Sequence, residues 1–364
     1  MIYYLLFIPY FLASILSIDI FFRRALRPVA FISIFIMVFF AGTQYGIGDY
    51  YNYLSIYKGY SFSDFAVPFF TSYEHGGTGH EFIFSSLAVA LQSLGFPYGV
   101  FFILLSVVTV GGKLLFLYKF SPYFFISLVV YLAFIYLKDM TQLRGAMASS
   151  IIIWSTIFIV RNKPFYFILS IFFASGFHVF SIVALPLYWI CISRFSSSVV
   201  VLGLIVSYFL SFHSSFVQFF LNYADNDTLG YIYRKVEGYY HGDRQAEVNP
   251  FGSGSFFYVF VILFCIYRKE KIFSYSPLSW YAFIYFAYGF ILYILFFDLS
   301  IIAYRSLEVF SHLALAFILA VLVKVETKFM RLFWWSLSVI YASFFAYVKI
   351  NDVAPYRSVL FSSY

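Results

Sequence analysis

Charged side chains are scarce in this chain. Asp, Glu, Lys and Arg make up 11% of its 364 residues, whereas a soluble domain carries roughly 25%. Hydrophobic residues reach 63%, and the mean hydropathy is +0.88. Too few polar groups remain to cover a surface in water, so lipid must be the solvent of most of the chain. A sizeable soluble domain is therefore excluded.

Cysteine is rarer still. Cys191 and Cys265 are the two cysteines of the chain, and their spacing fits neither a zinc site nor a redox motif. Each lies within a few residues of a basic cluster that we assign to the cytoplasmic side. We therefore expect two reduced thiols that serve in packing, and we expect no metal site and no cofactor.

The alternation of apolar and polar residues that is typical of membrane β-strands is also absent. Apolar runs long enough for membrane-spanning helices recur along the whole chain instead. Helices satisfy their backbone hydrogen bonds internally, so the sequence predicts an all-α polytopic membrane protein with about 12 spanning helices, in a range of roughly 10 to 14. We expect a single transmembrane domain over residues 1–364. The spans are expected at roughly 3–22, 28–44, 98–118, 123–138, 145–160, 164–178, 180–193, 197–220, 255–267, 277–297, 301–323 and 332–349.

Two apolar segments need a separate interpretation. Met1–Phe22 has no basic leading region and no small-residue cleavage site, so we expect it to be kept as the first helix. The run 81–95 is short for a full crossing. We expect it to be re-entrant or broken, and joined to the next helix through Gly95 and Pro97.

Basic residues indicate the orientation, because they concentrate in cytoplasmic loops. The side that we assign to the cytoplasm holds 14 of 23 basic and 3 of 16 acidic residues, a net charge of +11. The outer side then holds 9 basic and 13 acidic residues, a net charge of −4, which accounts for the overall +7. Orientation thus explains the excess of positive charge, and no nucleic-acid partner is implied. The basic clusters are Arg23/Arg24/Arg27, Lys113/Lys119, Arg161/Lys163, Arg194, Arg268/Lys269/Lys271 and Lys324/Lys328/Arg331.

Two long outer loops are predicted, at about 45–80 and about 222–254. Both combine acids, bases, His, Gly and Tyr. Aromatic faces beside carboxylates and guanidinium groups suit a carbohydrate site, because sugar rings stack on the rings and hydroxyls bind the charges. The alternative is a solvated connector. In the second loop, Arg234, His241 and Arg244 are the residues we expect to turn toward a substrate.

Ionisable residues near the ends of predicted spans point to the same side. Arg144 leads directly into a helix, His178 ends one, and Arg305 with Glu308 lies in the first turns of another. An Arg within hydrocarbon costs about 2.5 kcal/mol or more, so it usually faces a polar cavity. Snorkelling or pairing between helices is the alternative for each.

A glycine-rich turn follows the second predicted span, in Gly42-Thr-Gln-Tyr-Gly46-Ile-Gly48-Asp49. Two glycines permit a tight turn, and Asp49 would then present a carboxylate at the membrane interface. A dinucleotide site is excluded, because this GxG does not follow a strand.

The pattern of these motifs resembles the EpsG-like, Wzy-type polysaccharide polymerases of bacteria. The resemblance covers most of the chain and includes two departures. Gln44 stands where that family usually has Arg, and Gly48 adjoins Asp49 directly where a Thr often intervenes. The motifs are Tyr45-Gly-Ile-Gly-Asp49-Tyr50, His80-Glu81-Phe82, Leu143-Arg144, Phe177-His178, Arg305 and Pro355-Tyr356.

The resemblance implies a GT-C-like architecture and glycosyl transfer from a polyprenyl diphosphate. Charge would develop on phosphate in the transition state, and the planar fork of Arg binds phosphate in a bidentate manner. The implied diphosphate-binding residues are Arg144, Arg305, Arg234 and Arg244. A base must also accept the proton of the acceptor hydroxyl, and four candidates stay open. They are Asp49, Glu81, His178 and His241.

The implied partners are the bilayer of the bacterial inner membrane, a donor and an acceptor linked to undecaprenyl diphosphate, and a protein that regulates chain length. Two other functions fit the sequence. One is an O-antigen ligase or another transferase that uses lipid-linked sugars. The other is a transporter or flippase, which would tend to show ionisable residues near the midplane and an internal repeat. We find no such repeat.

Overall fold

Helices account for every regular element in the described part of the chain. The computed structural model describes residues 2–59, 81–193, 196–213, 248–351 and 356–358. Within these ranges, the strand-like pairing is limited to an isolated antiparallel bridge between Gln44 and Ser358. The all-α fold class predicted from hydropathy is confirmed.

Six of the described helices are long and apolar enough to cross a bilayer. Three are uninterrupted: α10 (Leu143–Val160), α18 (Pro277–Leu295) and Lys328–Val348 within α21 (Lys328–Asn351). The other three each contain a π-helical segment. They are α6–η2–α7 (Tyr98–Ser106, Val107–Gly111, Gly112–Phe120), α8–η3–α9 (Phe124–Tyr131, Leu132–Tyr136, Leu137–Thr141) and α19–η5–α20 (Ser300–Ser306, Leu307–Ser311, His312–Val325).

Seven shorter apolar helices accompany them, which makes the chain a multi-pass membrane protein as expected. These lie in α1 (Ile2–Leu16), α3 (Arg27–Gly42), α5 (Phe82–Ser93), α11 (Pro164–Ser175), the pair η4 (Val179–Ala184) and α12 (Leu187–Ile192), α13 (Ser196–His213) and α16 (Ser253–Tyr267).

Proline begins several helices. Pro28, Pro164 and Pro277 each lie at the first or second position of a helix, where the missing N–H of proline is not needed. At α18, the hydroxyl of Ser276 also accepts a hydrogen bond from the N–H of Leu278, at 3.2 Å. The start of α18 is thus set by a cap and a proline together.

The helix α5 is too short to cross the membrane alone. Its 12 residues span about 18 Å at the usual rise, against about 30 Å of hydrocarbon. Gly95 follows it with a φ of +76°, and Pro97 caps the start of α6. The predicted break at Gly95 and Pro97 is therefore confirmed.

Three short helices were missed from the sequence. α4 (Tyr50–Gly59) lies inside the segment expected as a loop from residue 45. α2 (Ile20–Ala25) and α17 (Lys269–Tyr275) carry basic residues between apolar helices. Hydropathy does not detect such elements, because it selects apolar runs of membrane length.

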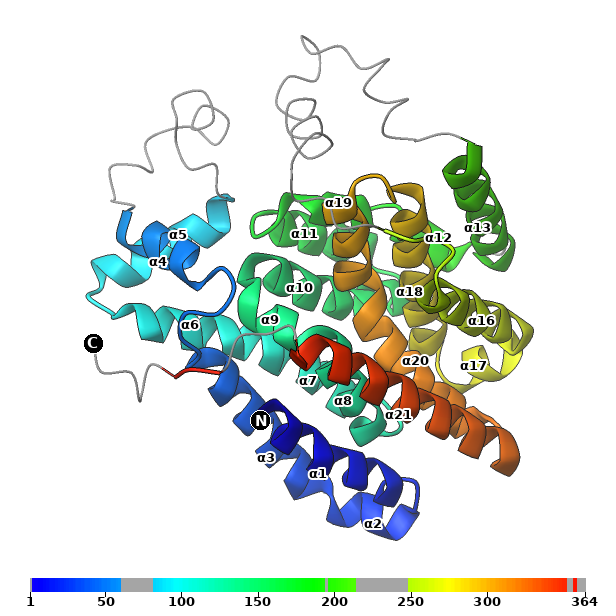
Figure 1. Cartoon of the computed structure of the whole chain (residues 1–364). Helices are drawn as coiled ribbons and strands as arrows, with labels where there is room; N and C mark the ends of the chain where they lie inside the picture. The colour runs from blue at the N-terminus through cyan, green and yellow to red at the C-terminus, as the bar shows by residue number, and fades with distance from the viewer. Residues whose placement is uncertain (1, 60–80, 194–195, 214–247, 352–355, 359–364) are drawn as a thin grey trace. The chain divides into compact units, whose positions relative to one another are not determined.

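The chain separates into two compact units. Unit 1 comprises Met1–Leu185 and Ala316–Tyr364, and unit 2 comprises Pro186–Leu315. In unit 2, α18 is the central helix and packs against α12, α13, α16, α17, α19 and η5. In unit 1, α10 packs against α11 and η2, and α3 packs against α6 and η2 (Figure 1).

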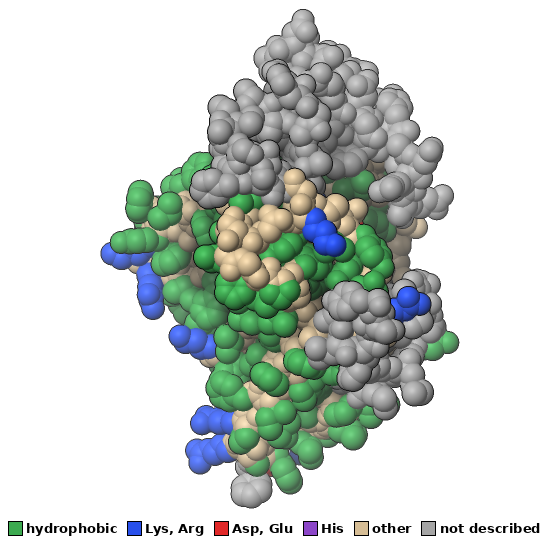
Figure 2. Space-filling model, turned by 90° about the vertical axis from the view of Figure 1, so that its left-hand side faces the viewer, with side chains coloured by type: hydrophobic (Ala, Val, Ile, Leu, Met, Phe, Trp, Pro, Cys, Tyr) green, Lys and Arg blue, Asp and Glu red, His purple; other side chains and the backbone are tan. Residues whose placement is uncertain are grey.

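The surface agrees with a lipid environment. The face drawn in Figure 2 carries mainly hydrophobic side chains and few Lys or Arg. Large apolar residues such as Phe35, Phe165 and Phe329 are more than two-thirds exposed. Such exposure is unfavourable in water but neutral against lipid chains. The two cysteines are free and buried, as expected.

Lys113 corrects one assignment of the charge pattern. It was placed with Lys119 in a cytoplasmic cluster, but it lies within the α6–η2–α7 span and is 1% exposed. There it forms an ion pair with Asp139, which had been counted on the outer side. The pair is neutral, so the predicted net charge of each side changes by only one unit and the overall net charge is unaffected.

Candidate active site

The glycine turn that presents Asp49 is built against the end of α9. Gly46 and Gly48 adopt φ values of +69° and +60°, which favour glycine. A Cβ added at Gly48 would overlap the side chain of Thr141. The N–H of Asp49 meets the carbonyl of Thr141 at 3.4 Å. Glycine thus allows the turn to close on α9.

Gln44 holds the same turn from inside the protein. Its side chain is 1% exposed. The Nε2 group donates to the carbonyl of Met140 at 3.3 Å, and Oε1 accepts from the N–H of Ile47 at 3.3 Å. A neutral amide can both donate and accept, whereas an Arg at this position could only donate. The departure noted at Gln44 therefore has a structural role here.

Residues near the C-terminus brace the turn from its other side. The N–H of Tyr45 donates to the carbonyl of Arg357 at 2.8 Å. The hydroxyl of Tyr356 donates to the carbonyl of Phe40 at 3.0 Å and lies 3.0 Å from Oγ1 of Thr43. The Tyr356 motif singled out in the sequence thus acts on the same turn as Asp49.

Asp49 occupies the position before α4. Its carbonyl accepts from the N–H of Tyr53 at 3.0 Å, and its Oδ1 lies 3.5 Å from the side-chain nitrogen of Asn52. Asp is a preferred residue at a helix start, where its carboxylate faces the positive end of the helix. The side chain is half-buried.

Glu81 and Arg144 form the central ion pair of the site. Nη1 of Arg144 lies 2.7 Å from Oε2 of Glu81, and the two side chains are 27% and 13% exposed. Glu81 precedes α5, and Arg144 lies in the first turn of α10. A cation is unfavourable at the positive end of a helix, so the Glu81 carboxylate offsets that repulsion.

Gly176 brings His178 to this pair. The carbonyl of Gly176 accepts from the N–H groups of Ile83 and Phe84, at 2.9 and 3.3 Å. A Cβ at Gly176 would overlap the side chain of Ile83, so glycine allows the approach. His178 follows two residues later, and its charge acts on Glu81.

The electrostatics of Glu81 follow from these neighbours. Burial alone would raise the pKa of the Glu81 carboxyl, but electrostatic attraction to Arg144 and His178, together with hydrogen bonds to the carboxylate, lowers the pKa below its usual value. Glu81 is therefore ionised at neutral pH. A carboxylate with a lowered pKa is a weak base, whereas general-base catalysis works best when the pKa of the base is near the working pH.

Tyr53 links Asp49 to the ion pair and was missed from the sequence. Its ring centroid lies 6.0 Å from the guanidinium carbon of Arg144. Burial raises the pKa of Tyr53; the charge of Arg144 acts to lower it and that of Asp49 to raise it further. With 35 tyrosines in the chain, the usual interpretation of any one is packing, and no local signal marks Tyr53.

One buried hydrophobic cluster positions all four candidate residues. Asp49 immediately precedes a cluster member, Arg144 and His178 each adjoin one, and Glu81 is three residues from one. This placement brings residues that are far apart in the sequence to the same part of unit 1. The cluster comprises Tyr50, Tyr53, Ile56, Tyr57, Phe84, Ala88, Leu91, Phe101, Phe102, Leu105, Leu143, Met147 and Phe177.

The other sequence candidates lie elsewhere. Arg305 belongs to unit 2 and pairs with Glu308, one turn later, at 3.5 Å. Both side chains are half-buried; Arg305 lies at the end of α19 and Glu308 within the π-helical segment η5. Arg234, His241 and Arg244 lie outside the described residues. Among the residues that the structure does describe, no group of three or more His, Cys, Asp or Glu could hold a metal ion.

The two turn glycines provide a matched prediction. Gly48→Ala should remove most activity, because the added methyl overlaps Thr141 and the positive φ costs an L-residue about 1–2 kcal/mol. Gly46→Ala carries the same φ penalty, but its methyl meets the side chain of Tyr51 without overlap, the nearest atom being the hydroxyl at 3.3 Å. We expect Gly46→Ala to keep more activity at equal protein level. Equal losses in both variants would show that the contact with Thr141 is unimportant.

Comparison with known proteins gives a family assignment. The sequence model of the EpsG family matches residues 28–359. Neither the curated proteins nor the solved structures include a match to this chain. The GT-C-like architecture thus stays a prediction.

Proposed function

Because this chain belongs to the EpsG family, we propose that it polymerises lipid-linked oligosaccharide repeat units into a surface polysaccharide at the bacterial inner membrane. Family membership supports a polysaccharide polymerase-like role in the broad sense. The observation that carries the finer proposal is the Glu81–Arg144 ion pair, with His178 beside it and Asp49 joined to it through Tyr53.

In the proposed reaction, a hydroxyl oxygen of the acceptor repeat unit attacks the anomeric carbon of the donor chain. The bond from that carbon to the lipid diphosphate breaks, and the diphosphate leaves with the electron pair. The hydroxyl proton passes to a base on the protein. Both carriers are undecaprenyl diphosphates in this proposal, so the donor brings its own leaving group and no nucleotide is required.

Arg144 suits the charge that develops on the leaving diphosphate. It is partly exposed, permanently charged and carries five N–H donors. Glu81 accepts a hydrogen bond from Nη1 of Arg144 and thereby orients the guanidinium group. We propose that Glu81 positions Arg144 and does not itself take the proton, because its carboxylate is engaged in the ion pair.

Asp49 and His178 are then the candidate bases within the described site. Asp49 has the better support, because the turn that presents it is held by Gln44, by Thr141 and by the C-terminal segment. Such bracing is what a catalytic group needs in order to keep its geometry. The roles predicted for Arg305, Arg234, Arg244 and His241 stay predictions.

The decisive experiment is deletion of the gene followed by complementation, with the surface polysaccharide resolved on a gel. A polymerase predicts that the ladder collapses to a single repeat unit and returns with the wild-type gene. Loss of attachment to lipid A core with normal chain length would identify a ligase. Accumulation of repeat units on the cytoplasmic face would identify a transporter or flippase.

The proposed site requires its residues to face away from the cytoplasm. Three exposed serines allow a test: Ser55 in α4, Ser253 at the start of α16, and Ser274 beside the basic cluster of α17. We expect an impermeant maleimide to label Ser55→Cys and Ser253→Cys in intact spheroplasts, and Ser274→Cys only after permeabilisation. The reverse pattern would place the site in the cytoplasm and exclude this mechanism.

A further inference from the structure

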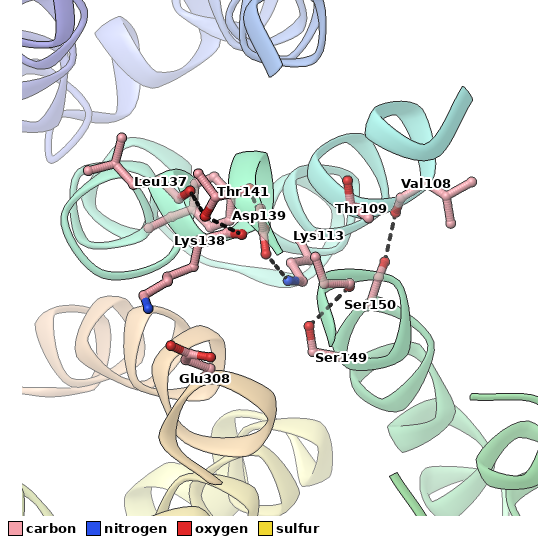
Figure 3. A network of polar contacts seen from close by, with 12 residues as sticks. Val108, Thr109, Lys113, Leu137, Lys138, Asp139, Thr141, Ser149, Ser150 and Glu308 are labelled. Carbon is pink, nitrogen blue, oxygen red and sulfur yellow. Dashed lines mark hydrogen bonds and ion pairs between the residues drawn. The ribbon is translucent and has the colours of Figure 1, made fainter. Parts of the chain in front are cut away.

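A buried ion pair joins two of the membrane-spanning helices, Tyr98–Phe120 and Phe124–Thr141. The side chains of Lys113 and Asp139 are 1% and 3% exposed, and Figure 3 shows Lys113 pointing toward Asp139. The hydroxyl of Tyr131 donates to the second carboxylate oxygen at 2.8 Å. Removing two charges from water costs several kcal/mol per ion, on the order of what the attraction returns. Stability alone is therefore a weak reason for this pair.

Both partners follow π-helical segments. The segment η2 leads directly into α7, which carries Lys113. The segment η3 lies between Tyr131 and Asp139. π-helical turns are rare and occur frequently at functional sites. Ser150 of α10 donates to the carbonyl of Val108 in η2, at 2.9 Å. The helix α10, which carries Arg144 in its first turn, is thus tied to the π-helical segment that precedes Lys113.

The end of α9 connects the ion pair to Asp49. Asp139 lies in the last turn of the helical span Phe124–Thr141, of which α9 is the end, and is followed by Met140 and Thr141. The carbonyls of these two residues accept from the Gln44 side chain and the Asp49 N–H. The backbone then breaks at Gln142, with φ −123° and ψ +62°, and α10 begins. Arg144 follows two residues after the break.

An acid at the end of a helix needs a compensating cation. The last carbonyls of a helix carry partial negative charge, so a carboxylate there is repelled. Lys113 reaches Asp139 from another helix and offsets that repulsion. Without Lys113, the end of α9 would be expected to move, and with it the carbonyls that hold the Asp49 turn.

We propose that the ion pair of Lys113 and Asp139, with Tyr131, positions the catalytic residues by holding the end of α9 between the Asp49 turn and the start of α10. Its consequence for activity rests on the proposed polymerase function. None of the three residues touches substrate in this proposal. They act through backbone contacts to Asp49 on one side and through the break before Arg144 on the other.

The test separates positioning from folding. A single change such as Lys113→Met leaves a buried charge and is expected to lower the protein level. The double variant Lys113→Met/Asp139→Leu removes both charges, so no unpaired charge stays buried, and replacement of a buried ion pair by apolar residues is often neutral for stability. Tyr131→Phe removes only one hydrogen bond and is the second variant, should the double variant accumulate poorly. Ser127→Ala is the matched control, because its buried hydroxyl bonds to Ala316 and not to α9.

Hydrogen exchange of the purified protein measures positioning without reference to activity. In the double variant we expect residues 44–50 to exchange about tenfold faster, while 146–153 in α10 stay as in the wild type. Tyr131→Phe should give a smaller rise in the same segment. Ser127→Ala should leave both segments unchanged. In cells, the double variant should be present in the membrane but make little polymer.

Two outcomes would overturn the proposal. Unchanged exchange at 44–50 in both the double variant and Tyr131→Phe would show that the pair does not hold the turn. Faster exchange with a full polysaccharide ladder would show that the held geometry is not needed. If the wild type itself restores no polymer, the proposed function fails, and the exchange result still decides whether the pair positions the turn.

Discussion

Arg144→Ala is expected to abolish polymer formation while the protein still reaches the membrane. Removal of a single donor that stabilises transition-state charge typically lowers a rate by about 100- to 1000-fold. Arg144→Lys should fail almost as badly, because a point charge does not replace the planar fork. The rate of chain extension with lipid-linked repeat units, at matched protein level, is the measurement.

Two comparison variants separate catalysis from stability at this position. Arg161→Ala changes an exposed Arg just beyond the other end of α10 and should leave activity unchanged. The double variant Arg144→Met/Glu81→Leu leaves no unpaired charge, so its protein level should recover relative to Arg144→Ala. It should remain inactive. Recovery of polymer in this double variant would show that the ion pair is structural.

Asp49→Asn is expected to lower the extension rate by about 100- to 10,000-fold if Asp49 takes the proton of the acceptor hydroxyl. Asn is the sharpest replacement here, because it has nearly the same shape and is also a preferred residue at a helix start. The start of α4 should therefore persist, and only the charge is lost. Equal membrane levels of variant and wild type are a condition of this test.

Asp19→Asn is the matched control, since Asp19 is exposed between α1 and α2. It should retain full activity. His178 is the competing base, and His178→Gln keeps a polar side chain of similar size. If Asp49→Asn stays active while His178→Gln does not, the proton goes to His178, and Asp49 serves only as a helix cap.

Several candidate residues of the site could be singled out from the sequence, because they depend on local patterns. Arg144 and His178 stood out as ionisable residues at the ends of long apolar runs, where a charge is costly and so informative. The glycine turn before Asp49 was visible from Gly46 and Gly48, both of which adopt positive φ. Family resemblance supplied Glu81, which hydropathy alone does not distinguish.

Other features depended on contacts between distant segments. Tyr53 gains its place from the approach of α4 to α5 and α10, and nothing near it in the sequence announces this. Lys113 was misassigned because a basic residue near the end of an apolar run looks like a loop residue. Its partner Asp139 lies 26 positions away, and pairing inside a membrane protein is decided by which helices pack together.

The sequence by itself determined the class of the protein, its succession of apolar helices and the residue types available for chemistry. These follow from composition and from the period and length of apolar runs, which are properties of the chain before it folds. Only the tertiary structure decided that the neighbours of Asp49, Glu81, Arg144 and His178 pack into one hydrophobic cluster in unit 1. The physical reason is that packing, close approach at Gly48 and Gly176, and ion pairing each require two segments to meet, and neither segment alone encodes the meeting.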